Sequence, residues 1–222
     1  MKPIMKTTAV LLCAAGMMLG MACCQKTADE GDTVILLGYE SYVVPLMDFM
    51  PDTLRTVFPS HFGSMPEGYI PPNIEGEYRI GKKQFCHANL FPIHDTEDMH
   101  LRITHQHNRV AHVELDEYGT VTTDTAYIMG NGPKFTLYFT EVKETTFFGA
   151  QCSNTRLVVI SGEKTDKGIK DLRFGNIILD EGESSDPYIT AFVPGMYFIY
   201  KDEDGLSEYC DWFDHQEGDG RR

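Results

Sequence analysis

From residue 76 to residue 210 the chain alternates between apolar and polar positions, with turn residues between the alternating runs. Residues 109–121, "RVAHVELDEYGTV", show the pattern clearly, because every second side chain of the run is apolar: Ala111, Val113 and Leu115. Successive side chains of a strand point to opposite faces of a sheet. This period of two therefore predicts a strand with one buried face.

Residues 125–139, "TAYIMGNGPKFTLYF", place two apolar runs on either side of Gly130-Asn131-Gly132-Pro133. Glycine and asparagine at such a junction are typical of a tight turn, so this segment predicts a β-hairpin. Further apolar runs lie at residues 155–162, 174–182 and 195–205. Together the runs make about eight strands, with no convincing helix between them.

These strands predict a mainly β domain, an antiparallel meander that closes as a barrel of about eight strands, with a β-sandwich as the alternative. Residues 74–80, "IEGEYRI", open the meander behind an N-terminal cover. This layout resembles the calycin or lipocalin-like barrels of Bacteroidetes-type lipoproteins. The resemblance spans residues 73–205, and barrels of this kind host many different functions.

A short strand and helix extension precedes the meander. Its strand-like run is "TVILLGYESYVV", and its helical candidate at residues 51–63 has Pro51 and Asp52 in the first turn and Gly63 at the end. Residues 64–76 contain three prolines and two glycines, which predicts a loop. We expect this extension to pack on the main domain as a plug or a cover.

The N-terminus has the layout of a secretory signal. Lys2 and Lys6 precede an apolar run at residues 9–21. The run is shorter than the roughly 20 apolar residues that a membrane-spanning helix needs, which favours a signal peptide over a transmembrane anchor.

The end of this signal resembles the lipobox of bacterial lipoproteins, in which a small residue precedes a cysteine that becomes acylated. Ala22 precedes Cys23, which we expect to be the lipidated residue; Cys24 is the alternative, because the leucine at position 19 lies one place too far back. Acyl chains on this cysteine would anchor the protein to a membrane.

The predicted organisation follows from these boundaries. Residues 1–22 form the signal peptide, 23–32 an acidic tether, 33–75 the extension, 76–210 the barrel domain and 211–222 an acidic tail. The acidic tether resembles those of Bacteroidetes-type lipoproteins that are routed to the cell surface; a solvated tether without a sorting role is the alternative. We expect an outer-membrane lipoprotein on the periplasmic or cell-surface face.

The net charge limits the partners that the chain can bind, and the number of cysteines limits the disulfides that it can form. Loss of Lys2 and Lys6 with the signal leaves 17 basic and 33 acidic residues, a formal charge of −16, which argues against binding to nucleic acid. Outside the signal peptide and the anchor the cysteines are Cys86, Cys152 and Cys210. An odd number allows at most one disulfide, with three candidate pairings, or three reduced thiols packed as small apolar groups.

Two polar clusters could hold a metal ion. His105 and His107 are two residues apart in the run at residues 100–107, with His112 and Glu114 across the next turn. Solvated histidines near a turn explain the same residues, and the "HDTEDMH" cluster at residues 94–100 is equally consistent with a polar loop.

The second cluster, at residues 200–211, places acidic side chains and a glycine near the positions of a calcium loop: Asp202, Asp204, Gly205, Glu208 and Asp211. The first ligand position is Tyr200, which has no carboxylate, and a tight Asp-Gly turn accounts for the pattern. We therefore predict no metal and no cofactor.

Catalytic signatures are absent from the sequence: it has no Gly-x-Ser-x-Gly, no His-Glu-x-x-His and no phosphate-binding glycine loop. We expect a binding protein rather than an enzyme, holding a small hydrophobic molecule or a glycan fragment in the barrel, with aromatic residues lining the site: Tyr138, Tyr197, Tyr200 and Trp212. The alternative is a structural or interaction subunit of an outer-membrane or cell-surface complex. A cavity in the barrel would favour the first, and a filled core with an exposed apolar patch the second.

Overall fold

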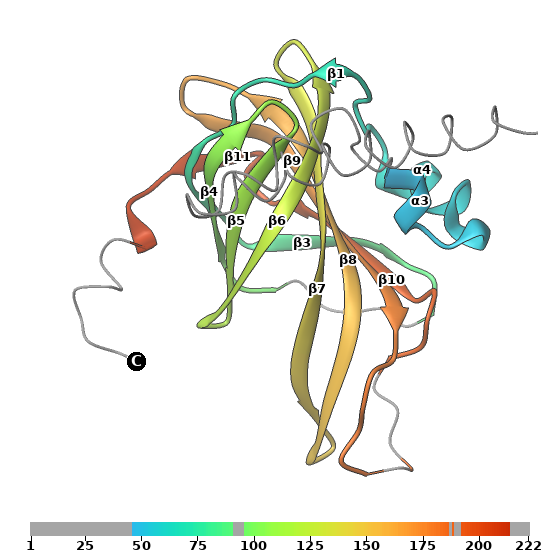
Figure 1. Cartoon of the computed structure of the whole chain (residues 1–222). Helices are drawn as coiled ribbons and strands as arrows, with labels where there is room; N and C mark the ends of the chain where they lie inside the picture. Colours follow the sequence, from blue (N-terminus) through green and yellow to red (C-terminus); the bar gives the residue numbers. More distant parts are fainter. Residues whose placement is uncertain (1–45, 91–95, 187, 189–191, 214–222) are drawn as a thin grey trace, which may run out of the picture. The chain divides into compact units, whose positions relative to one another are not determined.

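The computed structural model describes residues 46–90, 96–186, 188 and 192–213 (Figure 1). Strands make up most of these residues, and helix is confined to short segments at the N-terminal side, which confirms the mainly β prediction. The helical segments are α3 (Leu46–Phe49), η1 (Asp52–Leu54) and α4 (Val57–Phe62). The strands are β1 (Tyr69–Ile70), β2 (Gly76–Ile80), β3 (Lys83–Ala88), β4 (Met99–His107), β5 (Val110–Glu117), β6 (Thr120–Asn131), β7 (Lys134–Phe147), β8 (Ala150–Lys164), β9 (Gly168–Asp180), β10 (Tyr197–Asp202) and β11 (Leu206–Tyr209).

Eight strands close into a ring in the order β11-β2-β4-β5-β6-β7-β8-β9, with β9 pairing back to β11. The predicted barrel-like meander is thus confirmed, although the ring is uneven. One edge of β9 is shared: its residues 168–170 pair with β11, and its residues 173–177 pair with β10. Beyond β10 lies β3, so β10 and β3 form a wing that branches from the ring.

The inner face of the sheet is filled with apolar side chains. In β5 the alternation predicted from sequence is confirmed, because Ala111, Val113 and Leu115 are at most 1% exposed. They join a buried cluster to which β2, β4, β6, β7, β8, β9 and β10 also contribute. Close packing of these side chains is the main stabilising element of the ring.

A second apolar layer covers the outer face of β8, β9 and β10. Leu157 and Val159 alternate with inward-facing neighbours, yet both are fully buried. On this outer face Phe58 and Phe62 of α4 lie against Gly175 of β9, where an added Cβ would come within 2.7 Å of the Phe58 ring. The extension therefore covers the outside of the sheet, while its strand-like run at residues 33–44 lies outside the described residues.

The predicted hairpin and helix signals are largely confirmed. The β6–β7 turn has Gly132 at φ 60°, and Gly63 follows α4 at φ 91°. The single helix expected over residues 51–63 is instead η1 followed by α4. The three cysteines of the described residues are free thiols: Cys86, Cys152 and Cys210. Within the part of the chain that the structure describes, no helix is both long and apolar enough to cross a membrane.

Candidate functional site

A groove of about 700 Å³ lies on the outer face of the ring, beside the segment that follows β11. Its volume falls in the range of roughly 300–1,000 Å³ that is usual for sites of small ligands. The lining residues come from β2, the segment before β4, β4, β5, the β5–β6 turn and the C-terminal segment: Arg79, Glu97, Asp98, His100, Asp116, Tyr118, Gly119, Cys210, Asp211 and Trp212.

The floor of the groove is a row of polar side chains across three strands. Arg79 of β2 is the register partner of His100 of β4, which in turn is the partner of Asp116 of β5. Side chains directly opposite each other on neighbouring strands lie on the same face about 5 Å apart. Arg79 Nε donates a hydrogen bond of 2.8 Å to Asp98, which fixes the guanidinium at one end of the row.

Trp212 lies over this row. Its ring stacks on His100 with a centroid distance of 3.9 Å and an interplanar angle of 3°. Its indole Nε1 donates a hydrogen bond of 2.7 Å to Asp116 Oδ2. The ring nonetheless remains 37% exposed, so part of it is available to a ligand.

The C-terminal segment that carries Trp212 is held by a second row of polar residues. Glu77, Arg102 and Glu114 are register partners across β2, β4 and β5, and Arg102 forms ion pairs with both carboxylates. The backbone N–H of Phe213 donates to Glu77 Oε2 at 3.1 Å, and the Arg102 guanidinium lies 4.7 Å from the centre of the Phe213 ring. Trp212 is therefore placed by contacts on the sheet rather than by a free tail.

Burial and charge define the chemistry of the groove. Burial lowers the pKa of His100, against the opposing effect of Asp116 and Asp98, which favours the neutral imidazole at pH 7. Asp116 is only 5% exposed, and its Oδ1 has no hydrogen-bond partner in the structure. Among the described lining residues, four are carboxylates and one is the guanidinium of Arg79, so the groove favours neutral or cationic ligands.

The rim of the groove is an unusual hairpin turn. Tyr118 and Gly119 form the two-residue β5–β6 turn with φ values of 58° and 75°. Turns with two positive φ values strongly prefer Asn-Gly, and a bulky residue there is strained. Tyr118 is 65% exposed, so its ring stands at the mouth of the groove.

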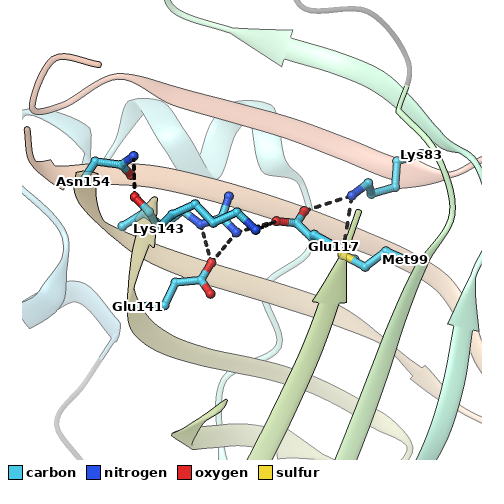
Figure 2. Close-up of polar contacts among 7 residues, drawn as sticks. Lys83, Met99, Glu117, Glu141, Lys143 and Asn154 are labelled. Atoms are coloured by element: carbon cyan, nitrogen blue, oxygen red, sulfur yellow. Dashed lines mark hydrogen bonds and ion pairs between the residues drawn. The ribbon is translucent and has the colours of Figure 1, made fainter. Parts of the chain in front are cut away.

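A second polar region lies inside the ring, where a cluster of charged side chains ends the apolar core (Figure 2). Lys83 Nζ lies 3.0 Å from Glu117 Oε1, and Lys143 Nζ lies 3.5 Å from Glu117 Oε2. Arg156 bridges Glu117, at 2.5 Å, and Glu141. These residues come from β3, β5, β7 and β8, so the cluster ties the wing to the ring.

The Glu117 carboxylate of this ion cluster stays charged because cations surround it. Burial alone would raise the pKa of Glu117, but Arg156, Lys83 and Lys143 outweigh it and hold that pKa far below its usual value. Burial lowers the pKa of Lys83, with Glu117 opposing it. Burial would likewise lower the pKa of Arg156, yet Glu117 and Glu141 raise it overall. The cations and carboxylates of the cluster neutralise one another, which is typical of a structural role.

The histidine candidates lie where β4 loses its regular register with β5. Leu101 and Ile103 belong to the inner core, but the register shifts after Thr104 and His105 has φ 51°. The rings of His105 and His112 are 6.4 Å apart. Among the described residues no group of three or more His, Cys, Asp or Glu side chains is arranged to hold a metal ion.

The acidic candidates form a turn between β10 and β11. Asp202 Oδ2 accepts a hydrogen bond of 2.7 Å from the Ser207 hydroxyl, and Asp204 Oδ1 accepts one from the Leu206 N–H. From the cluster at residues 94–100, Asp98 and His100 line the groove, whereas His94 lies outside the described residues.

The aromatic candidates are divided among three places. Tyr200 belongs to the inner core. Tyr138 and Tyr197 lie on the outer face beneath the helical cover, against Phe49 and Phe58. Trp212 lies in the groove, whose other residues the sequence pattern did not bring together.

Comparison with models of protein families, with curated proteins and with solved structures finds no match for this chain.

Proposed function

We propose that this protein is a lipid-anchored, exported binding protein whose outer groove takes a glycan fragment, and that it is not an enzyme. The observation that carries the proposal is the partly exposed Trp212 ring beside a buried Asp116 oxygen without a hydrogen-bond partner. An aromatic ring offers a flat apolar surface to the C–H face of a sugar, and carboxylate oxygens accept hydrogen bonds from its hydroxyl groups.

The charge of the groove supports a neutral ligand. Glu97, Asp98, Asp116 and Asp211 outnumber Arg79, and Arg79 is already paired with Asp98. Uronic acids, sulfated sugars and nucleic acids would meet like charge there. Neutral hexoses and amino sugars would meet no like charge in the groove.

We place the ligand on the outer face because the inner face of the ring is filled. Apolar side chains pack the inside, and the ion cluster occupies the end of this core. A small hydrophobic ligand inside the barrel, the other ligand class expected from sequence, would have to displace these side chains. In the groove the exposed part of the Trp212 ring is open to a ligand without displacement of core side chains.

The binding test is a glycan array of neutral and acidic oligosaccharides probed with the wild-type protein and with Trp212→Ala. We expect selective binding to neutral glycans that is lost in the variant. Tyr69→Ala is the matched control, because Tyr69 is a 78% exposed aromatic residue outside the groove. No binding to any glycan, or equal binding by Trp212→Ala, would contradict the proposal.

The anchor is tested separately, since the lipobox lies outside the described residues. Cys23→Ala should abolish metabolic labelling with a fatty acid and release the protein from membranes. Labelling that persists until Cys24 is also replaced would move the site by one residue. Labelling that neither replacement affects would contradict the anchor.

A further inference from the structure

Asp116 and Glu117 are neighbouring carboxylates at the end of β5, and each is 5% exposed. Because successive side chains of a strand point to opposite faces, Glu117 lies inside the ring and Asp116 in the floor of the outer groove. Three cations form ion pairs with Glu117 (Figure 2): Lys83, Lys143 and Arg156. Among the residues that the structure describes, no cation forms an ion pair with Asp116. The two carboxylates are equally buried, but only Glu117 has a counter-charge there.

The neighbours of Asp116 explain why its charge is left unbalanced. Its register partners are His100 on β4 and Val121 on β6. Burial lowers the pKa of His100, so this imidazole is neutral at pH 7. The indole N–H of Trp212, which is also neutral, donates the one hydrogen bond that the Asp116 side chain accepts within the described part of the chain. A buried carboxylate without a counter-charge is unfavourable, so the free protein leaves a negative charge uncompensated at the groove.

The rest of the groove does not supply the missing cation. Arg79 is the one lysine or arginine among the described lining residues, and its Nε and Nη2 both donate to Asp98. Glu97 and Asp211 also line the groove, and neither forms an ion pair with a described residue. These two side chains are exposed, so water and salt screen their charges more than that of Asp116. The groove therefore lacks positive charge mainly where the carboxylate is buried.

A ligand that carries an ammonium group would supply this counter-charge. An ammonium is a compact cation with three N–H donors, so it balances a carboxylate and donates hydrogen bonds at the same time. The Trp212 ring, 37% exposed beside Asp116, offers a flat apolar surface to the C–H face of a sugar. We propose that the groove selects glycans whose sugars carry a free, protonated amine over the same glycans with the amine acetylated. This inference rests on the proposed glycan function and names the sugar class within it.

Calorimetric titration with two β-1,4-linked tetramers tests the selection, one of glucosamine and one of N-acetylglucosamine. The two share length and linkage and differ in the charge of the amine. At about pH 6, where the sugar amines are protonated, we expect the wild type to bind the glucosamine tetramer about tenfold more tightly. The ratio of the two affinities should fall to about threefold or less at about 1 M salt, where the screening length is about 3 Å.

Equal affinities for the two tetramers, or tighter binding of the acetylated one, would overturn the inference and leave the glycan function standing. Binding of neither tetramer would overturn the inference as well. Only the glycan array, with its wider set of sugars, can contradict the glycan function itself.

Asp116→Asn removes the buried charge and keeps an oxygen that can accept from the Trp212 indole. We expect this variant to reduce the ratio of the two affinities to about threefold or less. Asp166→Asn is the matched control, because it removes one carboxylate at an exposed position in the β8–β9 turn, outside the groove. It should keep the wild-type ratio. A wild-type ratio in Asp116→Asn would show that this carboxylate does not select the amine.

The same variant tests the premise without any ligand. If Asp116 has no counter-charge in the folded protein, Asp116→Asn should leave the melting temperature unchanged or raise it by a few degrees. Glu117→Gln should lower the melting temperature by several degrees, because three cations would lose their shared carboxylate. An equally large fall in Asp116→Asn would show that the protein already balances this charge, and would overturn the inference.

A tetralysine peptide with an acetylated N-terminus distinguishes a sugar amine from an amine of any kind. It carries as many ammonium groups as the glucosamine tetramer but has no sugar face for the Trp212 ring. We expect it to bind about tenfold more weakly than the glucosamine tetramer, since it lacks the contact with the aromatic ring. Equal or tighter binding of the peptide would overturn the selection of a sugar and would make basic peptides the ligands of the groove.

Discussion

The ion cluster and the outer groove both contain a buried carboxylate oxygen without a hydrogen-bond partner, Glu141 Oε2 in the cluster and Asp116 Oδ1 in the groove. Their surroundings differ. Glu141 faces Arg156 inside the ring, so its charge is neutralised within the chain. Asp116 lies in the floor of a groove whose aromatic residues remain partly exposed. A buried charge alone therefore does not indicate a binding site in this protein. A buried charge beside an accessible aromatic surface does.

The largest effect should come from Arg156→Met, which leaves two buried carboxylates without their shared cation. We expect the free energy of unfolding to fall by about 3–5 kcal/mol, the usual cost of breaking a buried ion pair. Urea denaturation at pH 7 measures it. Lys134→Met, an exposed position on β7, is the control and should change stability by less than about 0.5 kcal/mol. A loss below about 1 kcal/mol for Arg156→Met would mean that the cluster is not structural.

Acid should weaken the protein through the same cluster. The pKa of Glu117 is lower in the folded than in the unfolded protein, so its stabilising effect is complete above the unfolded value of about 4.3 and is lost as pH falls toward the folded value. We expect the melting temperature of the wild type to fall below pH 4.3, and a shallower fall for Glu117→Gln. Glu144→Gln, at an exposed position, should retain the wild-type profile. Parallel profiles for wild type and Glu117→Gln would contradict this linkage.

Tyr118→Asn should separate stability from binding in the groove. Asparagine accommodates the positive φ of this turn, so stability should rise by up to about 1 kcal/mol. Affinity for an oligosaccharide identified on the array should fall by about fivefold, the effect of losing an aromatic contact of about 1 kcal/mol. Calorimetric titration and thermal unfolding measure the two effects. Unchanged affinity would remove Tyr118 from the site.

The smallest effect should be that of Lys143→Met. Lys143 makes the longest of the three ion pairs with the Glu117 carboxylate, at 3.5 Å, and Arg156 and Lys83 still neutralise this carboxylate without it. We expect stability to change by less than about 1 kcal/mol. A loss as large as that of Arg156→Met would show that all three cations act as one unit.

Local pattern was enough to predict seven of the eight strands of the ring. β11 was not predicted, and the predicted run at residues 195–205 forms β10, which lies outside the ring. The alternation of Ala111, Val113 and Leu115, and the turn at Gly132, hold in the structure. β3 was not predicted because its sequence, "KQFCHA", is half polar and does not alternate between polar and apolar residues. Lys83 is buried there only because Glu117, 34 residues later, lies opposite it, which no local pattern reveals.

Local sequence patterns also could not predict the groove. Trp212 was one of the aromatic candidates but falls where the sequence predicts an acidic tail, and its partners His100 and Asp116 come from two different strands. The metal hypothesis for His105 assumed an unbroken strand, whereas the backbone shifts register at that residue. The site depends on contacts between residues that are distant in the sequence, namely the closure of β9 on β11 and the contacts of the C-terminal segment. Local sequence patterns cannot predict such contacts, so the site is evident only in the folded structure.

The most direct test of the central claim is the indole N–H resonance of Trp212, which is the only such signal of the protein. It should appear once in a ¹⁵N-edited NMR spectrum of the wild type. Titration with a neutral oligosaccharide selected on the array should shift it saturably, with the affinity that calorimetry gives. An unmoved indole signal, with shifts confined to residues of the inner face, would place the ligand inside the barrel and contradict the account.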